Sequence, residues 1–256
     1  MIEHISIVII TKNVEETLAK TLDSVTEFSN VVLWDNGSED ASLQIAANYP
    51  NVDVHQGEFI GFGPSKNLAC SLAKNAWVFS LDADESLSPE LVTSLRSWPT
   101  DNEQAVGEVL RENHFMGRAV RHGGWGNDRL IRLFHFGQHQ FDDAKVHEKV
   151  ALSEQSQTHA LAGHIEHQAA RSLGEFLQKV DRYSEIRRQS RQKTYPAGII
   201  FLKAFFAFFR SFVLKRGFLA GWRGLVIAWS NANGVFFKYM KVLADQKTAR
   251  DARHRD

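Results

Sequence analysis

Four short apolar runs constrain the fold of this 256-residue chain more than any other feature. Nearly continuous runs of this kind are typical of strands buried on both faces of a parallel sheet. Segments of helical character lie between them, and a further helix is expected to start at Ser88-Pro89-Glu90. Strands that alternate with helices predict an α/β domain with a mostly parallel central sheet flanked by helices. The runs are residues 5–10, 30–34, 52–55 and 76–81, and the helical segments are residues 14–28, 40–48 and 64–74.

The pattern changes after residue 105. Residues 130–134 and 146–150 are expected to be antiparallel strands, and the Gly-rich residues 122–126 a mobile loop. Residues 171–192 have the charge and spacing of an amphipathic helix. The expected organisation is a main domain of residues 1–170, with halves 1–100 and 101–170, and a helical region of residues 171–256.

The charges are distributed unevenly, although the formal net charge is zero. Residues 171–256 hold 18 Lys or Arg and 6 Asp or Glu, whereas residues 1–170 hold 12 basic and 24 acidic residues. The chain has 28 aromatic residues, and 13 of them lie in the basic segment, between Tyr195 and Tyr239. A basic, aromatic segment behind an acidic domain indicates an anionic partner surface. Cys70 is the only cysteine, which excludes an intrachain disulfide, and no signal peptide is expected.

Residues 199–214 have the pattern of a helix that lies in a membrane interface. They contain six Phe, and Lys203 and Arg210, seven residues apart, share one helix face. Arg223 and Asn231 interrupt the next apolar stretch, so no transmembrane span is expected. The alternative is an oligomer interface or a helix packed on the main domain. Nucleic acid is disfavoured because the aromatic residues form a dense apolar face rather than separate stacking sites.

Polar residues follow three of the predicted strands, at the point where each strand ends. Thr11-Lys12-Asn13 follow the first strand, Asp35 the second and Asp82-Ala83-Asp84 the fourth. Because parallel sheets bind ligands at the carboxyl ends of their strands, these groups are expected to meet in one site. Two carboxylates one residue apart can share Mg²⁺ or Mn²⁺ and, through it, a diphosphate. A solvated turn with a helix N-cap is the alternative for this pair.

Three other polar residues each have a structural alternative. Asp35 can accept a hydrogen bond from a nucleobase or a ribose hydroxyl, or it can form an Asx turn. Asp40 is expected to be a cap or turn residue. Lys66 lies near a helix start, which attracts phosphate, or it is a solvated surface lysine.

Four motifs lie in order along the first third of the chain: residues 6–13 (SIVIITKN), 34–40 (WDNGSED), 61–67 (GFGPSKN) and 80–85 (SLDADE). Further matching segments are Arg132-Leu133-Phe134, Val146-His147-Glu148 and Lys215-Arg216-Gly217-Phe218. With this ordered set the chain resembles the family 2 glycosyltransferases of GT-A fold. More closely, it resembles the bacterial lipopolysaccharide core β-1,4-glucosyltransferase group.

The resemblance implies an inverting, metal-dependent enzyme that transfers a hexose, with glucose from UDP-glucose favoured. The implied acceptor is a lipid-linked saccharide such as the lipopolysaccharide inner core. The implied location is the cytoplasmic face of the bacterial inner membrane, where the chain would be a peripheral protein. The alternatives are another nucleotide sugar, a polyprenyl-phosphate acceptor, or a nucleotide-binding protein without transferase activity.

The resemblance also implies roles on the nucleotide side of the site. Thr11, Asn13 and Glu15 would line the nucleotide pocket, with Asp35 on the base. Val14 departs from the family pattern, in which an acidic residue commonly follows the asparagine.

On the phosphate side, the implied roles centre on the acidic pair. Lys66 and Asp82 would face the ribose and the diphosphate. Asp84 would be the direct metal ligand, and Asp82 the second residue at the metal. Arg129 and Arg132 would bind phosphate on the donor or on a phosphorylated acceptor, or they would be ordinary strand-surface arginines.

Glu148 is the predicted general base, which an inverting transfer needs on the face opposite the leaving group. The resemblance and its place in an apolar strand motivate this role, whereas a surface Glu paired with Lys145 or Lys149 is the alternative. His164 and His167 are expected on opposite strand faces. His167 is the better functional candidate, because a histidine recurs at this point in the family pattern.

Overall fold

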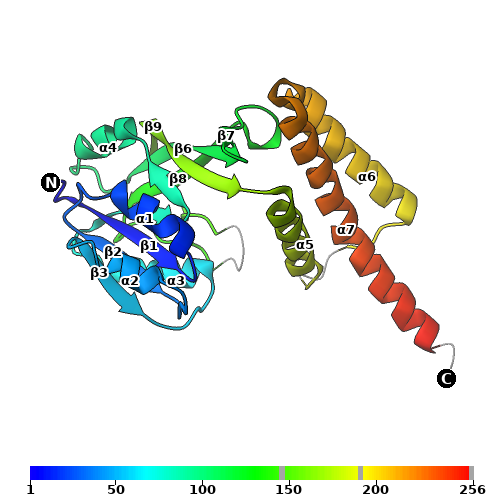
Figure 1. Ribbon diagram of the computed structural model, residues 1–256, viewed down its shortest axis with the longest axis horizontal. Coiled ribbons are helices and arrows are strands. Elements are labelled where there is room, and N and C mark those ends of the chain that lie inside the picture. The colour runs from blue at the N-terminus through cyan, green and yellow to red at the C-terminus, as the bar shows by residue number, and fades with distance from the viewer. Residues whose placement is uncertain (144–147, 190–192, 254–256) are drawn as a thin grey trace. The chain divides into compact units, whose positions relative to one another are not determined.

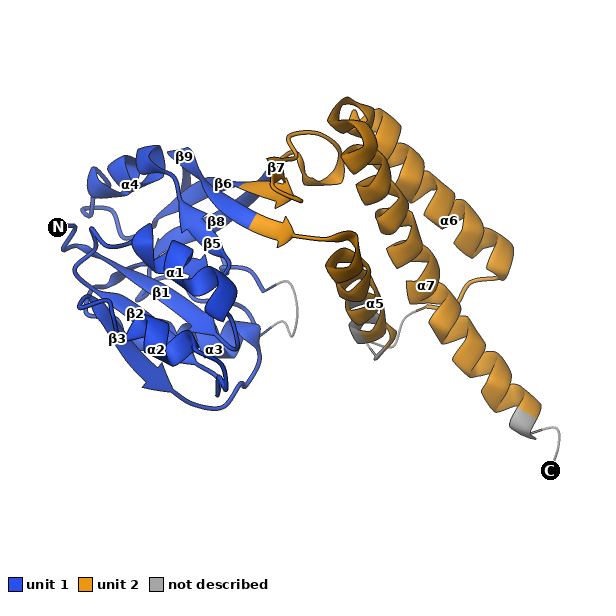
Figure 2. Cartoon of the chain, in the orientation of Figure 1, with its two compact units in different colours: residues 1–111, 128–167 blue, residues 112–127, 168–256 orange. Residues whose placement is uncertain are grey.

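The structure is a computed structural model that describes residues 1–143, 148–189 and 193–253. The chain divides into two compact units, which Figure 2 shows in different colours. Unit 1 consists of residues 1–111 and 128–167, and unit 2 of residues 112–127 and 168–256. Hydrophobic clusters lie within each unit, so each is described by itself.

The N-terminal half of unit 1 is a parallel sheet with helices packed on it (Figure 1). Its elements are β1 Ile5–Thr11, α1 Glu15–Asp23, β2 Val31–Asp35, α2 Ser42–Ala46, β3 Val52–Gln56, α3 Phe62–Ser71 and β4 Trp77–Asp82. β1 pairs with β2 and β4, and β2 pairs with β3, all in parallel. The four strands lie where the apolar runs predict them, so the predicted alternation is confirmed.

The other half of the sheet is antiparallel, which makes the sheet mixed. Its elements are β5 Glu85–Leu87, α4 Pro89–Arg96, β6 Ala105–Phe115, β8 Asp128–His135 and β9 Gln157–Ala170. The strand order is β3-β2-β1-β4-β8-β6-β9-β5, with the short β7 (Arg118–Ala119) paired to β6. α4 begins where the sequence predicts, because the Ser88 hydroxyl accepts a hydrogen bond from the Leu91 N–H at 3.3 Å. The predicted α/β class is confirmed.

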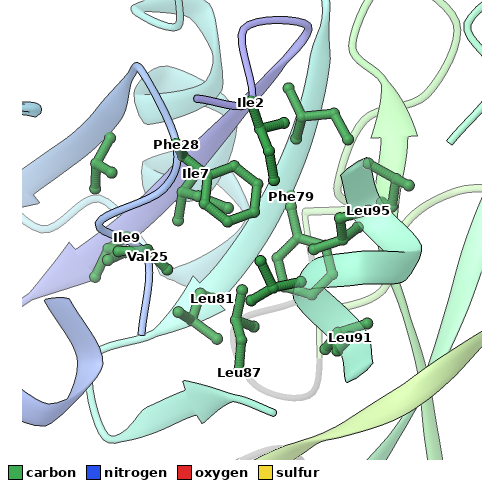
Figure 3. Close-up of a cluster of buried hydrophobic side chains, with 14 of the residues drawn as sticks. Ile2, Ile7, Ile9, Val25, Phe28, Phe79, Leu81, Leu87, Leu91 and Leu95 are labelled. Carbon is green, nitrogen blue, oxygen red and sulfur yellow. The ribbon is translucent and has the colours of Figure 1, made fainter. Parts of the chain in front are cut away.

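The core of unit 1 explains why the apolar runs are continuous. Ile7 and Ile9 of β1 pack in one cluster with Phe79 and Leu91, which Figure 3 shows together. Val8, between the two isoleucines, packs in a second cluster. Alternate side chains of a strand point to opposite faces, so a strand covered on both faces is apolar at most of its positions. Full burial of one such side chain contributes about 1.5–3 kcal/mol.

Unit 2 is mostly helical. Its elements are a single turn η1 Gly123–Trp125, α5 Leu173–Gln189, α6 Ala197–Phe209, a π-helical turn η2 Arg210–Leu214, a 3₁₀ turn η3 Gly217–Ala220 and α7 Gly221–Arg253. α5 and α6 both pack against α7. Phe115, Phe176 and Ile227 form the centre of its core, with Trp125 packed on them. β6 and β9 each begin in unit 1 and end in unit 2.

Two sequence expectations about the middle of the chain are wrong. Residues 122–126 are not a free loop, because Gly123 donates its N–H to the Lys215 carbonyl at 2.8 Å. Gly123 has φ +81°, and a Cβ there would lie 3.2 Å from the Gly217 Cα, so two backbones meet at this point. The expected strand at 146–150 is absent from its described residues. Val150 makes an isolated antiparallel bridge to Phe141. Hydrogen bonds from the Asp142 N–H to the Lys149 carbonyl at 2.9 Å and from the Ala151 N–H to the Gln140 carbonyl at 2.8 Å flank it, so the pairing is shorter than a strand.

Residues 144–147, with Lys145, Val146 and His147, lie outside the described residues.

The expectation of no membrane span also needs correction. Within the described residues, the helical stretch Ala197–Leu214 is long and apolar enough to cross a membrane, and 17% of it is buried. Lys203 and Arg210 are only two charges in this stretch, so they do not remove it from that class.

Candidate functional site

The three polar strand ends lie at the same edge of the sheet. Thr11 is in register with Asp35 on β2, and Ile10 with Asp82 on β4. The sequence predicts this meeting from the alternation of strands and helices alone, and the strand register confirms it. The site is therefore built on the carboxyl ends of β1, β2 and β4.

The turn between β4 and β5 is held in place by two threonines of α1. The hydroxyls of Thr17 and Thr21 each donate to the Ala83 carbonyl at 3.0 Å. The Asp82 N–H donates to the carboxylate of Glu85 at 3.1 Å, which closes the turn. These bonds fix the backbone between Asp82 and Asp84, so the two carboxylates have set directions.

The carboxylate of Asp82 is bonded to two cations. Its Oδ1 lies 2.8 Å from the Lys66 Nζ, and its Oδ2 lies 2.7 Å from an Nη of Arg132. Burial on its own would raise the pKa of Asp82, but Arg132 and Lys66 hold that pKa well below its usual range. Asp82 is therefore ionised across the physiological pH range, with both oxygens already in use.

Arg132 is also bonded to a carboxylate that the sequence analysis did not single out. Its guanidinium donates to both oxygens of Glu85 at 3.0 Å, and the Glu85 side chain is fully buried. Glu85 also accepts from Arg111 at 3.2 Å, and Arg111 lies 2.7 Å from Asp128. Burial raises the pKa of Glu85 against the attraction of Arg132. The local signal for Glu85 is a third acidic residue in the motif SLDADE.

Lys66 has a different environment from either sequence interpretation. Its side chain is 4% exposed, and its Nζ lies 2.8 Å from Asp82 and 2.8 Å from the Oε1 of Glu148. It also lies over the Phe141 ring, 5.3 Å from the centroid. Lys66 is thus neither a solvated surface lysine nor a free ammonium at the helix start. It joins the predicted general base to the acidic pair.

These contacts form one continuous ion-pair series of alternating charge. Each member lies within 3.2 Å of the next. In order, the members are Glu148, Lys66, Asp82, Arg132, Glu85, Arg111 and Asp128. Arg132 lies inside the series with a 6% exposed side chain, so its predicted contact with phosphate stays a prediction.

Asp84 points to a different partner from Asp82. Its Oδ2 lies 3.5 Å from the Nε2 of His167, and its side chain is 37% exposed. The pairing of β5 with β9 places Glu85 opposite His167, which brings this histidine to the acidic turn. His167 is thus the better placed of the two predicted histidines, because His164 lies past the other end of this pairing, where its carbonyl accepts from the Ser88 N–H at 3.0 Å.

The donor set around Asp84 can be compared with what Mg²⁺ or Mn²⁺ needs. No cluster of three or more His, Cys, Asp or Glu able to hold a metal occurs in the described residues. One carboxylate and one imidazole nevertheless suit a hydrated ion that takes its remaining ligands from a substrate diphosphate. The residues present fit such a shared ion at Asp84 and His167 better than at Asp82, whose oxygens are bonded to cations.

The carboxylate of Asp35 is fully buried and forms an Asx turn. It accepts from the N–H of Gly37 and of Ser38 at 3.2 and 3.1 Å, from the Ser38 hydroxyl at 2.5 Å and from Gln56 at 3.3 Å. The Oγ1 of Thr11, on the neighbouring strand end, is buried without a hydrogen-bond partner in the described part of the chain. The contact of Thr11 with a nucleotide stays a prediction.

Asn13 and Glu15 hold the neighbouring loop in place. The Asn13 N–H donates to Ser38 Oγ at 2.9 Å, and Glu15 Oε2 accepts from the Ala41 N–H at 2.9 Å. Asp40 accepts from the Glu15 N–H at 3.0 Å and from the Ser42 N–H, two residues on, at 3.0 Å, which confirms the expectation of a cap or turn residue. Asn13 and Glu15 therefore shape the loop beside Asp35, and their contact with a nucleotide stays a prediction.

Arg129 lies on β8 with a 44% exposed side chain. Its Nη1 is 3.5 Å from Glu108 on β6, a long and solvated ion pair. The residue is accessible to a ligand, and its predicted phosphate contact stays a prediction.

Comparisons with known proteins identify the family of this chain. The family model described as glycosyl transferase family 2 matches residues 6–218. The chain is 25% identical over 189 residues to the lipopolysaccharide core biosynthesis glycosyltransferase LpsC of Rhizobium meliloti, covering 72% of this chain and 70% of that protein. It is 38% identical over 90 residues to an uncharacterized glycosyltransferase of Rickettsia typhi. That match covers 35% of this chain and spans 30% of the relative's length.

Among solved structures, residues 1–349 of S. aureus TarS in complex with UDP-GlcNAc align with a TM-score of 0.48 at 16% identity. The alignment covers 96% of this chain and 92% of that one. The family model extends from the first strand to beyond α6, and the mixed sheet carries the acidic turn at its carboxyl edge. The chain therefore belongs to glycosyl transferase family 2, and it is a glycosyltransferase.

Proposed function

We propose that this enzyme transfers a hexose from a nucleotide sugar to a lipid-linked saccharide, with inversion at the sugar. UDP-glucose is the expected donor, and a lipopolysaccharide inner core is the expected acceptor. The observation that carries the proposal is the ammonium of Lys66, which lies 2.8 Å from both Glu148 and Asp82. A candidate base and the acidic turn thus lie on opposite sides of one buried cation. The similarity to LpsC, a lipopolysaccharide core biosynthesis glycosyltransferase, supports the class of acceptor.

In the proposed donor complex, the nucleoside lies over the ends of β1 and β2, beside Thr11 and Asp35. Asp84 and His167 would hold Mg²⁺ or Mn²⁺. The ion supplies positive charge that offsets the charge developing on the departing diphosphate. Asp82, fixed by Lys66 and Arg132, keeps the acidic turn in one conformation as the donor binds.

The proposed chemical step is one in-line displacement. The acceptor hydroxyl oxygen forms a bond to the anomeric carbon as the bond from that carbon to the diphosphate oxygen breaks. The hydroxyl proton goes to the carboxylate of Glu148, and the electron pair of the broken bond leaves with the nucleoside diphosphate. A base positioned for this proton contributes typically 10²–10⁴-fold to the rate.

A donor screen tests the proposal directly. The full chain is incubated with UDP-glucose, UDP-galactose, UDP-N-acetylglucosamine or GDP-mannose, and release of the nucleoside diphosphate is measured with and without Mn²⁺. Each reaction is run with lipid A-core, with a polyprenyl phosphate and with no acceptor. We expect metal-stimulated release from UDP-glucose that depends on lipid A-core. Absence of turnover with every donor and acceptor would contradict the proposal. Turnover only with polyprenyl phosphate would make that lipid the acceptor in place of the lipopolysaccharide inner core.

Replacing Asp84 with asparagine is expected to lower metal-stimulated transfer by about 100-fold or more, because it removes the charged ligand of the ion. His167→Ala should cause a smaller loss, of about tenfold, that excess Mn²⁺ partly restores. The measurement is the initial rate as a function of Mn²⁺ concentration. Asp101→Asn, an exposed carboxylate in the same unit, is the matched control. Equal metal activation curves for wild type and Asp84→Asn would rule out Asp84 as the ligand.

We also propose that unit 2 binds an anionic membrane through α6 and the first turns of α7. Ile200 and Ala204 are buried, while Phe201, Leu202 and Phe205 of the same helix are each about 60% exposed. The exposed apolar face continues on the neighbouring helix with side chains such as Trp222 and Trp229. α6 and α7 lie side by side in Figure 1.

The charges of α6 support a helix in the plane of the interface. Lys203 and Arg210 share one face of this helix, beside the Phe-rich face. Lys203 lies over the Tyr195 ring, 4.6 Å from the centroid, so its charge is held at the aromatic edge. A basic edge beside a wide apolar face matches the headgroup and acyl layers of anionic lipid.

The double substitution Phe201→Ser with Phe205→Ser is expected to weaken binding to phosphatidylglycerol vesicles at least tenfold. Each exposed phenylalanine that enters the bilayer contributes on the order of 1.5–3 kcal/mol. Co-sedimentation at low and high salt measures the effect, and Leu152→Ser, an exposed apolar residue of unit 1, is the control. Release of the wild type by alkaline carbonate would support a peripheral helix, whereas retention would indicate a span. A stable dimer without vesicle binding would instead assign this face to a second copy.

A further inference from the structure

One face of α3 contacts Phe141, Asp142 and Glu148. Gly63, Lys66 and Asn67 are three and four residues apart, so they lie on the same side of the helix. They contact described residues that lie more than 70 positions later in the chain: Asn67 bonds to Phe141, Gly63 lies against Asp142, and Lys66 pairs with Glu148.

Asn67 and Gly63 make the backbone contacts. The Asn67 amide donates to the Phe141 carbonyl at 2.9 Å and accepts from the Phe141 N–H at 2.8 Å. A Cβ on Gly63 would overlap the carbonyl oxygen of Asp142 and lie 3.7 Å from the Glu148 Cβ. A side chain at position 63 would thus displace the backbone at Asp142, which is a physical reason for glycine there.

Lys66 makes the side-chain contact with the carboxylate itself. An ammonium has three donor directions, and here two are used by carboxylates while the third side faces the Phe141 ring. Asp82 keeps a second cation in Arg132, at 2.7 Å. Glu148, in contrast, has Lys66 as the only cation within ion-pair distance among the described residues.

We propose that Lys66 is the positioning residue of Glu148, and that Gly63 and Asn67 hold the backbone at Phe141 and Asp142 close to α3. The buried ammonium holds the Glu148 carboxylate in the orientation from which it takes the acceptor proton. The inference rests on the proposed role of Glu148 as the base. The place of the motif GFGPSKN at a helix start predicts a contact with the donor diphosphate. The inference gives the motif a different role, which is to orient the base.

A double-mutant cycle distinguishes the two roles. Lys66→Met, Glu148→Gln and the double variant are compared by kcat at saturating donor and by the Kd for UDP-glucose, measured by calorimetry. We expect Lys66→Met to lower kcat about 10- to 100-fold while the donor Kd changes less than threefold. We expect the double variant to be no slower than Glu148→Gln alone, because a residue that acts through Glu148 has nothing to act on without it.

Further variants keep the test informative if Lys66→Met folds poorly. Asn67→Ala touches neither carboxylate and should lower kcat with an unchanged donor Kd, and Lys66→Arg should restore part of the rate. Lys74→Met, an exposed lysine just beyond α3, is the matched control and should keep wild-type values.

Two results would overturn the inference, and they differ in meaning. In the first, the rate losses of the two single variants multiply in the double variant, and Lys66→Met weakens the donor Kd tenfold or more. This result would mean that Lys66 contacts the donor diphosphate, and Glu148 would remain the base. A Glu148→Gln variant with near wild-type rate would instead reject the base, and the positioning role with it.

Discussion

Replacing Glu148 with glutamine lowers the rate of sugar transfer by about two to four orders of magnitude and leaves donor binding intact. Glutamine keeps the size of the side chain but cannot accept the proton of the acceptor hydroxyl, which is the contribution of a general base. The Glu148 side chain is 14% exposed and bonded to Lys66, so it is held near the acidic turn rather than in bulk solvent. The measurement is single-turnover transfer with saturating Mn²⁺ and UDP-glucose.

The control for this variant is Glu154→Gln, an exposed carboxylate a few residues further on. It should transfer at the wild-type rate. Titration of UDP-glucose into both variants shows whether the donor still binds. A Glu148→Gln enzyme that binds donor and transfers at more than about a tenth of the wild-type rate would place the base elsewhere.

Replacing Arg132 with methionine lowers the free energy of unfolding by about 3–5 kcal/mol at neutral pH. Removing one partner of a buried ion pair leaves the other charge without compensation. Glu85 is fully buried and receives two hydrogen bonds from Arg132, so this carboxylate loses most. Arg129→Met is the matched control on the same strand, and its exposed ion pair should be worth less than about 1 kcal/mol.

The loss in Arg132→Met should depend on pH with a definite sign. Burial already raises the pKa of Glu85, and removal of Arg132 raises it further. A carboxyl group whose pKa is higher in the folded state binds more protons when folded, so stability falls as pH rises through that pKa. Urea unfolding in EDTA should therefore show the full loss at about pH 8 and a smaller loss toward the unfolded glutamate pKa of about 4.3. An equal loss at both pH values would remove Glu85 as the cause.

The parallel half of the fold could be predicted because its signals are local. Each buried strand is a continuous apolar run, and each run ends in the polar residues that form the site. The meeting of Thr11, Asp35 and Asp82 follows from strand order alone, since parallel strands end at one edge. No knowledge of tertiary contacts is needed for that step.

The contacts of Lys66 and Arg132 could not be predicted in the same way. Both depend on strands and segments distant in sequence, and register between antiparallel strands is not encoded in a single run. The expected strand at 146–150 shows the converse, because in its described residues the pairing of Val150 with Phe141 is a single bridge, and the local sequence does not set that length. The roles of Glu148, Asp84 and the nucleotide-side residues remain predictions that the experiments above test.

The ion-pair series around Asp82 has a consequence for how the enzyme can receive a charged donor. Its four carboxylates and three cations come to a net charge of about minus one, so the lysine and both arginines are already neutralised within the protein. The diphosphate of a nucleotide sugar, with one ionised oxygen on each phosphate, brings further negative charge to this surface. The ion-pair series therefore holds the side chains of the site in place and offers no unpaired cation to attract the donor. We expect this attraction to come from a divalent ion that binds together with the donor.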